Sequence, residues 1–186
     1  MFENVRADIA AGSDWHRMPH LDRIIGKRAG RCASVLVTSS IQVVLIYRLQ
    51  AWLHRLHVPV LPEVCQQLTM VLASVQVGNN ITIGPGLLIA HGNVIIDGFG
   101  SIGAHCQVSP FVTIGLDTGG ADAGFDAPNI GDRVFIGTGA KILGPVTIGD
   151  DARIGANAVV TSDVPAGSTA VGIPARIISH MQGTGG

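Results

Sequence analysis

The chain is poor in charged and aromatic residues. Of its 186 residues, 13% are charged and 4% are aromatic, whereas about a quarter of the residues of a typical soluble domain are charged. A surface with so few charges predicts that other subunits cover part of it. The formal net charge of −1 gives no electrostatic basis for binding nucleic acid.

Cysteines are also few, and no apolar run is long. Cys32, Cys65 and Cys106 lack the spacing of metal ligands, so we interpret them as reduced, buried thiols of a cytoplasmic protein. The most apolar run, residues 35–49, is interrupted by five polar residues and is too short to span a membrane. The N-terminus has no apolar segment of the kind that signal peptides carry. We expect a cytoplasmic protein whose contact with a membrane is at most peripheral.

What the chain does contain is a six-residue repeat. From Val77 onward an aliphatic residue recurs at every sixth position, often followed by glycine. Two steps differ: the step from 89 to 96 has seven residues, and the step from 114 to 130 has sixteen, which is six plus an insertion of ten. The repeating residues are Val77, Ile83, Ile89, Ile96, Ile102, Val108, Ile114, Ile130, Ile136, Ile142, Ile148, Ile154 and Val160.

This repeat predicts a mainly β fold, a parallel β-helix. Each hexad forms a short strand with one inward aliphatic residue and then a tight turn, where glycine relieves crowding. Three hexads close one coil of about 18 residues, and stacked coils join their aliphatic side chains into one continuous core. A sandwich or barrel would instead alternate with a period of two.

The repeat also predicts how the chain is divided. We expect an N-terminal helical region at 1–74 and the β-helix at 75–178, with a loop insertion at 116–129 and a flexible tail at 179–186. Long loops in compact repeats are usually functional, so we expect the insertion to cover the active site beside a neighbouring subunit. The alternative is a disordered insertion.

Two helices are expected before the repeat. Residues 41–56 place apolar side chains at the helical period, and Pro59 ends that helix. A second helix is expected at 63–73. Ser13 and Asp14 are expected to cap a short earlier helix.

Four segments resemble the serine acetyltransferases of the hexapeptide-repeat acyltransferase superfamily. Residues 83–92 (IGPGLLIAHG) resemble the segment that carries the catalytic histidine of that family, and residues 112–115 (VTIG) resemble its glycine-rich site loop. Residues 136–144 (IGTGAKILG) and 170–176 (AVGIPAR) resemble its coenzyme A side and its C-terminal signature. The resemblance extends over residues 41–178.

The resemblance implies a left-handed β-helix that transfers an acetyl group from acetyl-CoA to a hydroxyl without a metal. It implies sites between the subunits of a homotrimer, or of a hexamer if the helical part joins two trimers. Coenzyme A is expected near Gly139, Ala140 and Ala158, whose small side chains allow its approach and whose backbone amides are candidate oxyanion donors. Lys141 and Arg176 are expected to meet its phosphates; the alternative for both is a simple surface charge.

Three departures from the family pattern concern the acceptor. In the family an aspartate precedes the catalytic histidine, a second aspartate lies fifteen positions before it, and another histidine precedes a Pro-x-Ile sequence. This chain has Ala90, Gln76 and Ala127 at those positions. Residues 1–8 and 120–132 resemble more closely the shorter acetyltransferases of exopolysaccharide biosynthesis, such as the colanic acid type. We therefore expect a sugar hydroxyl as the acceptor, with L-serine as the alternative.

His91 is the candidate general base of this reaction. It lies where the repeat carries its one extra residue, so its ring can lie at a corner outside the core. The alternative is a surface histidine on a turn. Gln76 is expected to orient the ring by accepting a hydrogen bond from its second nitrogen, and the alternative is a solvent-facing glutamine. His105 also lies at a turn, where we expect a surface residue.

Four aspartates are candidates for contacts with the acceptor, although a carboxylate at such a position is more often simply a solvated loop residue. They are Asp97, Asp117, Asp122 and Asp126.

Two other classes of protein are less compatible with the sequence. The γ-type carbonic anhydrases, which share this fold, need three histidines on zinc, and the repeat has only His91 and His105. A structural or ice-binding β-helix needs regular outward rows of threonine, and the threonines of this repeat do not form such rows.

Overall fold

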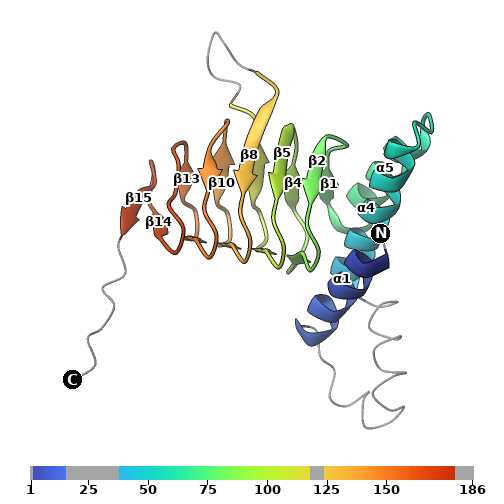
Figure 1. Cartoon of the computed structure of the whole chain (residues 1–186), viewed down its shortest axis with the longest axis horizontal. Helices are drawn as coiled ribbons and strands as arrows, with labels where there is room; N and C mark the ends of the chain where they lie inside the picture. Colours follow the sequence, from blue (N-terminus) through green and yellow to red (C-terminus); the bar gives the residue numbers. More distant parts are fainter. Residues whose placement is uncertain (1, 16–37, 118–123, 179–186) are drawn as a thin grey trace.

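A parallel β-helix forms the body of the protein, and helices cover one of its ends (Figure 1). The computed structural model describes residues 2–15, 38–117 and 124–178. The helices are α1 (Phe2–Trp15), α4 (Ser39–Arg55) and α5 (Leu61–Ala73). The strands are β1 (Val75–Val77), β2 (Ile81–Ile83), β3 (Leu88–Ile89), β4 (Val94–Ile96), β5 (Phe99–Ile102), β6 (Gln107–Val108), β7 (Thr113–Gly115), β8 (Asp126–Ile130), β9 (Phe135–Ile136), β10 (Lys141–Leu143), β11 (Thr147–Ile148), β12 (Arg153–Ile154), β13 (Val159–Val160), β14 (Thr169–Val171) and β15 (Arg176–Ile178).

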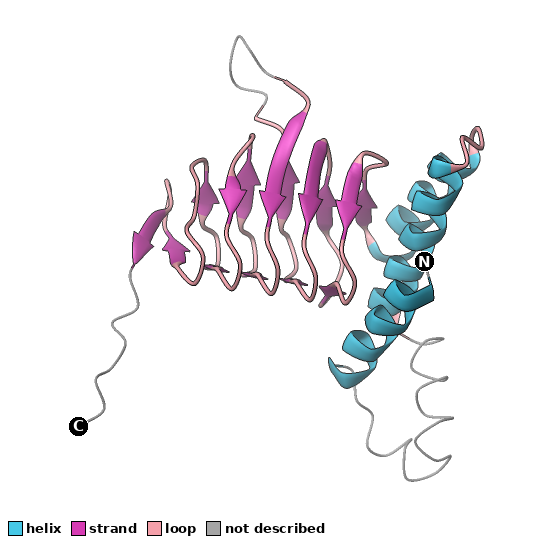
Figure 2. Cartoon of the chain, in the orientation of Figure 1, coloured by secondary structure: helices cyan, strands magenta, loops and turns pink. Residues whose placement is uncertain are grey.

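The strands form three sheets that the chain visits in turn (Figure 2). The first sheet has the order β1-β4-β7-β10-β13, the second β11-β8-β5-β2, and the third β15-β14-β12-β9-β6-β3. Every pairing is parallel except that of β14 with β15. The prediction of a mainly β fold of stacked coils is confirmed.

The repeating aliphatic residues form three columns inside the coils. In the first sheet, Val77 pairs with Ile96, Ile96 with Ile114, Ile114 with Ile142 and Ile142 with Val160. All five side chains are at most 1% exposed. Burial of each such side chain stabilises the fold by about 1.5–3 kcal/mol. A single coil has no neighbour to complete this burial, so the stack folds as a unit.

One turn position recurs in every coil between the second and third sheets. Gly86, His105, Arg133, Asp151 and Gly167 occupy it, and all have a positive φ. The last four donate their backbone N–H to a carbonyl of the preceding coil. His105 therefore lies on the surface of a turn, as expected. In the next two coils Arg133 binds Asp151 at 2.7 Å, and this hydrogen bond lowers the pKa of the Asp151 carboxyl.

The helices differ from the expectations mainly at their starts. The helix expected at 63–73 begins two residues earlier, at Leu61. The expected cap at Ser13 was wrong, because the first helix begins at Phe2 and Ser13 lies near its end, where its hydroxyl donates to the carbonyl of Ala10. None of the three described helices combines the length and the apolar character needed to cross a bilayer.

Side chains of α4 satisfy the backbone of the first coil, which has no preceding coil to donate to its carbonyls. Tyr47 donates to the carbonyl of Ile81 at 2.8 Å, and Gln50 donates to the carbonyl of Val77 at 2.8 Å. Arg48 donates to the next two carbonyls along the same edge, those of Ile83 and Gly84, each at 2.6 Å. The side-chain donors of α4 thus make the hydrogen bonds that a preceding coil would otherwise make. They cover the exposed backbone carbonyls at the start of the β-helix.

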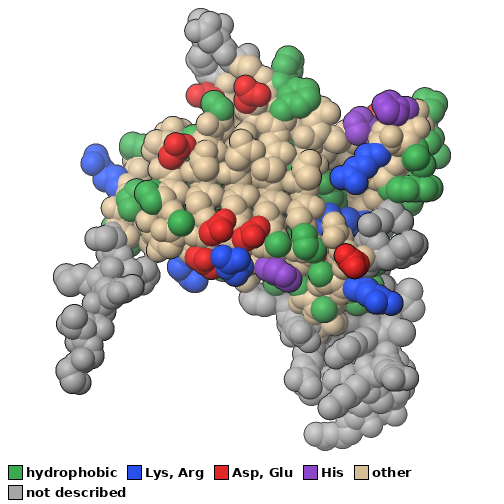
Figure 3. All heavy atoms as spheres, in the orientation of Figure 1, with side chains coloured by type: hydrophobic (Ala, Val, Ile, Leu, Met, Phe, Trp, Pro, Cys, Tyr) green, Lys and Arg blue, Asp and Glu red, His purple; other side chains and the backbone are tan. Residues whose placement is uncertain are grey.

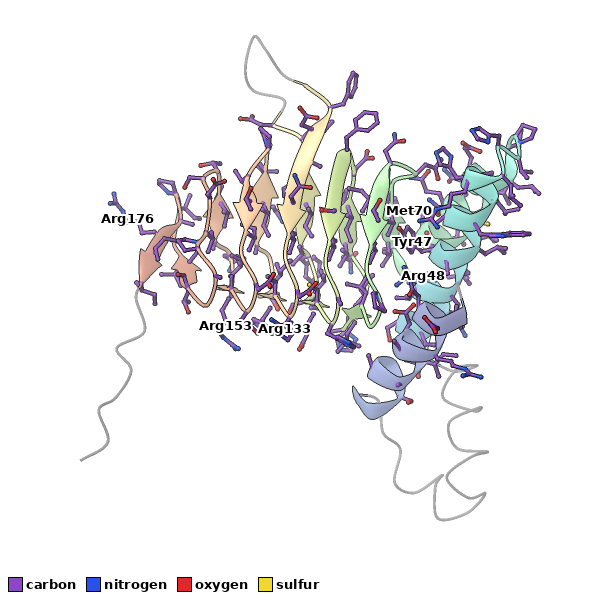
Figure 4. All side chains as sticks on the ribbon, in the orientation of Figure 1. Tyr47, Arg48, Met70, Arg133, Arg153 and Arg176 are labelled. Atoms are coloured by element: carbon purple, nitrogen blue, oxygen red, sulfur yellow. The ribbon has the colours of Figure 1, made fainter. Side chains whose placement is uncertain are left out.

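A buried ion pair holds α1 to this arrangement. Nε of Arg48 lies 2.8 Å from Oδ2 of Asp8, and the two side chains are 7% and 1% exposed. Oδ1 of Asp8 also accepts a hydrogen bond from the N–H of Gly86 at 2.7 Å. Figure 4 shows Arg48 and Tyr47 at the junction between the helices and the first coil. The pair therefore connects α1, α4 and the β-helix at a single point.

Candidate active site

His91 lies on the surface, at a turn from the third sheet to the first that is one residue longer than the equivalent turns of the later coils. The turn joins β3 to β4, and it takes five positions from Ile89 to Val94, whereas the equivalent step from Val108 to Val112 takes four. The side chain of His91 is exposed and outside the aliphatic core. The extra residue of the repeat thus places an imidazole at a corner of the β-helix.

The turn that carries His91 packs against the junction of α5 and β1. The N–H of Val94 donates to the carbonyl of Ser74 at 3.2 Å. A Cβ atom on Gly92 would collide with the carbonyl oxygen of Ala73, so only glycine fits there. Gln76 is two residues beyond Ser74, half-buried in the middle of β1 and opposite Ile95 of β4. The sheet therefore places Gln76 and the His91 turn on the same side of the molecule.

The outer face of the first sheet is hollowed beside this turn. A cavity of about 360 Å³ extends from the end of α5, where Figure 4 labels Met70, across three coils. Nζ of Lys141 donates to the carbonyl of Phe111 within it, at 2.7 Å. The lining is largely apolar with polar groups at intervals. It consists of Met70, Ser74, Asn93, Ile95, Phe111, Val112, Thr113 and Lys141. Because Asn93 belongs to the turn that carries His91, one end of the groove lies at that turn.

Several of the residues expected to contact coenzyme A are buried or already hydrogen-bonded. Ala140 and Ala158 are 0% exposed, with their methyl groups in the core, so their side chains do not line a groove and that expectation was wrong. Small residues are needed there because the corner of each coil has little room. The N–H groups of Gly139, Ala140, Lys141 and Ala158 all donate to backbone carbonyls, so the expected oxyanion donors are engaged as well.

Gly92 and Asn93 differ from these residues in a way that the sequence did not signal. Among the described residues, no hydrogen bond engages the N–H of either one. Asn93 has φ +62. Two amides that have no partner in the described part of the chain therefore lie on the same turn as His91.

Arg176 lies at the other end of the β-helix, away from the helices (Figure 4). It is exposed at the start of β15, the strand that pairs antiparallel with β14 and covers the last coil.

The candidate acceptor-binding aspartates gather at a different corner from His91. Asp97 follows β4, where its Oδ1 accepts from the N–H of Gly98 at 2.8 Å. Asp117 and Asp126 lie within the insertion and are exposed, and Asp122 lies outside the described residues. His91 and Asp97 stand at opposite ends of β4, six positions apart, which corresponds to at most about 20 Å along an extended chain. The two groups of side chains therefore lie beyond opposite ends of the same short strand.

Two exposed aromatic rings, which the sequence analysis did not single out, lie at this second corner. Phe99 and Phe125 are 52% and 72% exposed, and their ring centroids are 6.4 Å apart in a T-shaped arrangement.

Among the described residues, neither the cysteines nor the possible metal ligands form a further candidate site. Cys65 and Cys106 are buried and free, and burial raises the pKa of both thiols. Cys32 lies outside the described residues. Within residues 2–15, 38–117 and 124–178, no three His, Cys, Asp or Glu side chains are grouped as a metal site requires.

Comparison with known proteins first gives the class. A family model described as "Bacterial transferase hexapeptide (six repeats)" matches residues 127–162. Together with the coils and the exposed imidazole, this match defines a hexapeptide-repeat acyltransferase with a left-handed parallel β-helix. The relatives are more specific, and the chain belongs to the serine acetyltransferase family.

Three relatives and one solved structure illustrate the membership. A serine acetyltransferase of Helicobacter pylori is 39% identical over 149 residues, which are 78% of this chain and 84% of the relative. Those of Mycobacterium tuberculosis and Synechococcus elongatus are 34% and 36% identical over 83% and 74% of this chain. The chain spans 71% of the first and 56%, little more than half, of the second. The serine acetyltransferase structure from Neisseria gonorrhoeae matches with a TM-score of 0.81 at 29% identity, over 95% of this chain and 65% of that one.

Proposed function

We propose that this protein transfers the acetyl group of acetyl-CoA to an acceptor hydroxyl, with His91 as the general base. The observation that carries the proposal is the exposed imidazole on the lengthened turn, beside the groove on the first sheet. A serine acetyltransferase solved in complex with CoA has the same fold, with a TM-score of 0.76 at 29% identity. Acetyl-CoA as the donor agrees with the cytoplasmic location that the sequence predicts.

The residues of the turn supply the chemistry that acetyl transfer needs. The neutral imidazole of His91 accepts the proton of the acceptor hydroxyl as its oxygen attacks the thioester carbonyl. The N–H groups of Gly92 and Asn93 stabilise the negative charge that develops on the carbonyl oxygen. The thiolate of coenzyme A then leaves and takes the proton from the imidazolium, which returns His91 to its starting state. Gln76 orients the ring, although as a neutral group it stabilises imidazolium less than a carboxylate does.

L-Serine is the acceptor that we propose. All the relatives compared above are serine acetyltransferases, and one structure of the N. gonorrhoeae enzyme, with a TM-score of 0.77, is a complex with serine. The relatives give no support to the sugar hydroxyl that the sequence analysis favoured. One observation keeps an uncharged hydroxyl as the second candidate. Ala90 and Ala127 are at most 5% exposed and Gln76 is neutral, so none of the three positions offers a charge to a zwitterion.

An assay of thiol release separates the two acceptors. With acetyl-CoA, we expect saturable release of free thiol in the presence of L-serine, because the family relationship extends over most of the chain. A panel of neutral sugars and sugar nucleotides serves as the comparison, and O-acetylserine formation is confirmed by mass spectrometry. Turnover of a sugar without turnover of L-serine would instead establish the second candidate.

We also propose that the active protein is a homotrimer whose sites form between subunits. The position of His91 and the aspartates at different corners supports this, because a neighbouring copy can bring its second corner beside the His91 turn. Sedimentation equilibrium is expected to give three times the chain mass of 19.3 kDa, about 58 kDa. A mass of about 116 kDa also agrees, as a hexamer of two trimers, whereas an active monomer contradicts the proposal.

A further inference from the structure

A second cavity lies at the helical end of the β-helix. It measures about 270 Å³ and is enclosed by α1, the second half of α4 and the turn and strand from Asn79 to Ile83. It has no lining residue in common with the groove beside His91. Figure 3 shows Lys, Arg and His side chains at this end of the molecule, with an acidic side chain among them. The lining residues are Asn4, Tyr47, Arg48, Ala51, Trp52, His54, Arg55, Asn79, Asn80, Ile81, Thr82 and Ile83.

The cavity carries positive charge that no carboxylate of its lining neutralises. Asp8 already neutralises Arg48. Among the described residues, the side chains of His54 and Arg55 make no hydrogen bond or ion pair, and the lining contains no Asp or Glu. Such a site attracts an anion. It disfavours an amino acid, because the nearby carboxylates of Asp8 and Glu63 are already bonded to Arg48 and Asn79 and the lining offers no other carboxylate to an ammonium group.

The remaining lining residues suit a sugar ring, because some can pair with its hydroxyls and one can pack against its C–H groups. The side chains of Asn4, Asn80 and Thr82 make no hydrogen bond within the described residues, and each both donates and accepts, as pairing with hydroxyls requires. The indole of Trp52 is 44% exposed and offers a flat apolar wall to the C–H groups of a ring. The volume suits a single ring rather than a chain of sugars.

We propose that this cavity binds a phosphorylated monosaccharide. Arg55 and His54 hold the phosphate, the amides and the Thr82 hydroxyl bind the ring hydroxyls, and Trp52 packs against the ring. This binding does not depend on the proposed acetyl transfer, because no residue of the His91 turn takes part in it.

Glucose 6-phosphate is the probe that tests the proposal on the full-length protein. Titration monitored by tryptophan fluorescence and by calorimetry is expected to give a Kd below about 1 mM. Arg55→Gln is expected to raise this Kd by about tenfold or more, because a charge-assisted contact is lost. Arg153→Gln, which removes an exposed arginine stacked on Phe135 of the third sheet, is the matched control and leaves the Kd unchanged. Trp52→Phe is expected to remove the fluorescence response while calorimetric binding persists.

Three comparisons make the outcome decisive. Glucose and inorganic phosphate, each alone, are expected to bind at least about tenfold more weakly than the probe. His91→Ala is expected to bind the probe like the wild type, so a failure of the proposed acetyl transfer leaves this result intact. The proposal is overturned if binding does not saturate below 10 mM (about tenfold above the expected Kd), if Arg55→Gln binds normally, or if L-serine displaces the probe.

Discussion

His91→Ala is expected to lower kcat for acetyl transfer by a factor of about 10² to 10⁴, the usual contribution of a positioned general base. The KM for acetyl-CoA is expected to change little, because the imidazole acts on the acceptor and contributes little to the binding of the donor. The ring lies on the surface, so its loss creates no cavity in the core. Thiol release at saturating acetyl-CoA gives kcat, and an unchanged unfolding midpoint shows that the variant is folded.

His105→Asn is the matched control for this prediction. His105 is also an exposed histidine on a turn of the β-helix, at a position where φ is +56. Asparagine tolerates this left-handed conformation, so the variant is expected to fold and to keep wild-type activity. A His91→Ala enzyme that retains more than about a third of the wild-type kcat, far above the residual of a true base variant, rules out the proposed mechanism.

Arg48→Met is expected to lower the free energy of unfolding by about 3–5 kcal/mol, the usual effect of removing one partner from a buried ion pair. The substitution leaves the carboxylate of Asp8, 1% exposed, without its counter-charge. It also leaves the carbonyls of Ile83 and Gly84 without the donors that replace a preceding coil. Urea unfolding followed by circular dichroism measures the change.

Two further variants isolate the cause of that loss. Arg133→Gln breaks an Arg–Asp pair of similar geometry, with Asp151, but that pair is exposed, so little change in the urea midpoint is expected. Asp8→Asn combined with Arg48→Met removes the unpaired charge and is expected to recover part of the stability that the single variant loses. A loss of less than about 1 kcal/mol in the single variant would show that water reaches this site and that the pair behaves as an exposed one.

The candidate site was predictable only where the sequence pattern itself is irregular. The seven-residue step from Ile89 to Ile96 pointed to His91, because an extra residue in a repeat has to leave the column. The small residues Ala140 and Ala158 were misassigned, because a six-residue pattern shows that a side chain is small but not whether its methyl group faces a ligand or the core. The amides of Gly92 and Asn93 gave no signal at all, because hydrogen-bond satisfaction depends on where the next coil lies.

The sequence by itself determined the β-helix and its core, because each hexad repeats the same local choice of inward aliphatic residue and tight turn, and stacking then follows. The tertiary structure alone decided how the first coil is covered, since Asp8 and Arg48 are forty positions apart and nothing in the local pattern of either predicts that they meet. Likewise, it set His91 and the loop aspartates at different corners. Contacts between distant segments form only when the whole stack is assembled. Each strand and turn of the repeat, in contrast, is determined by its own six residues.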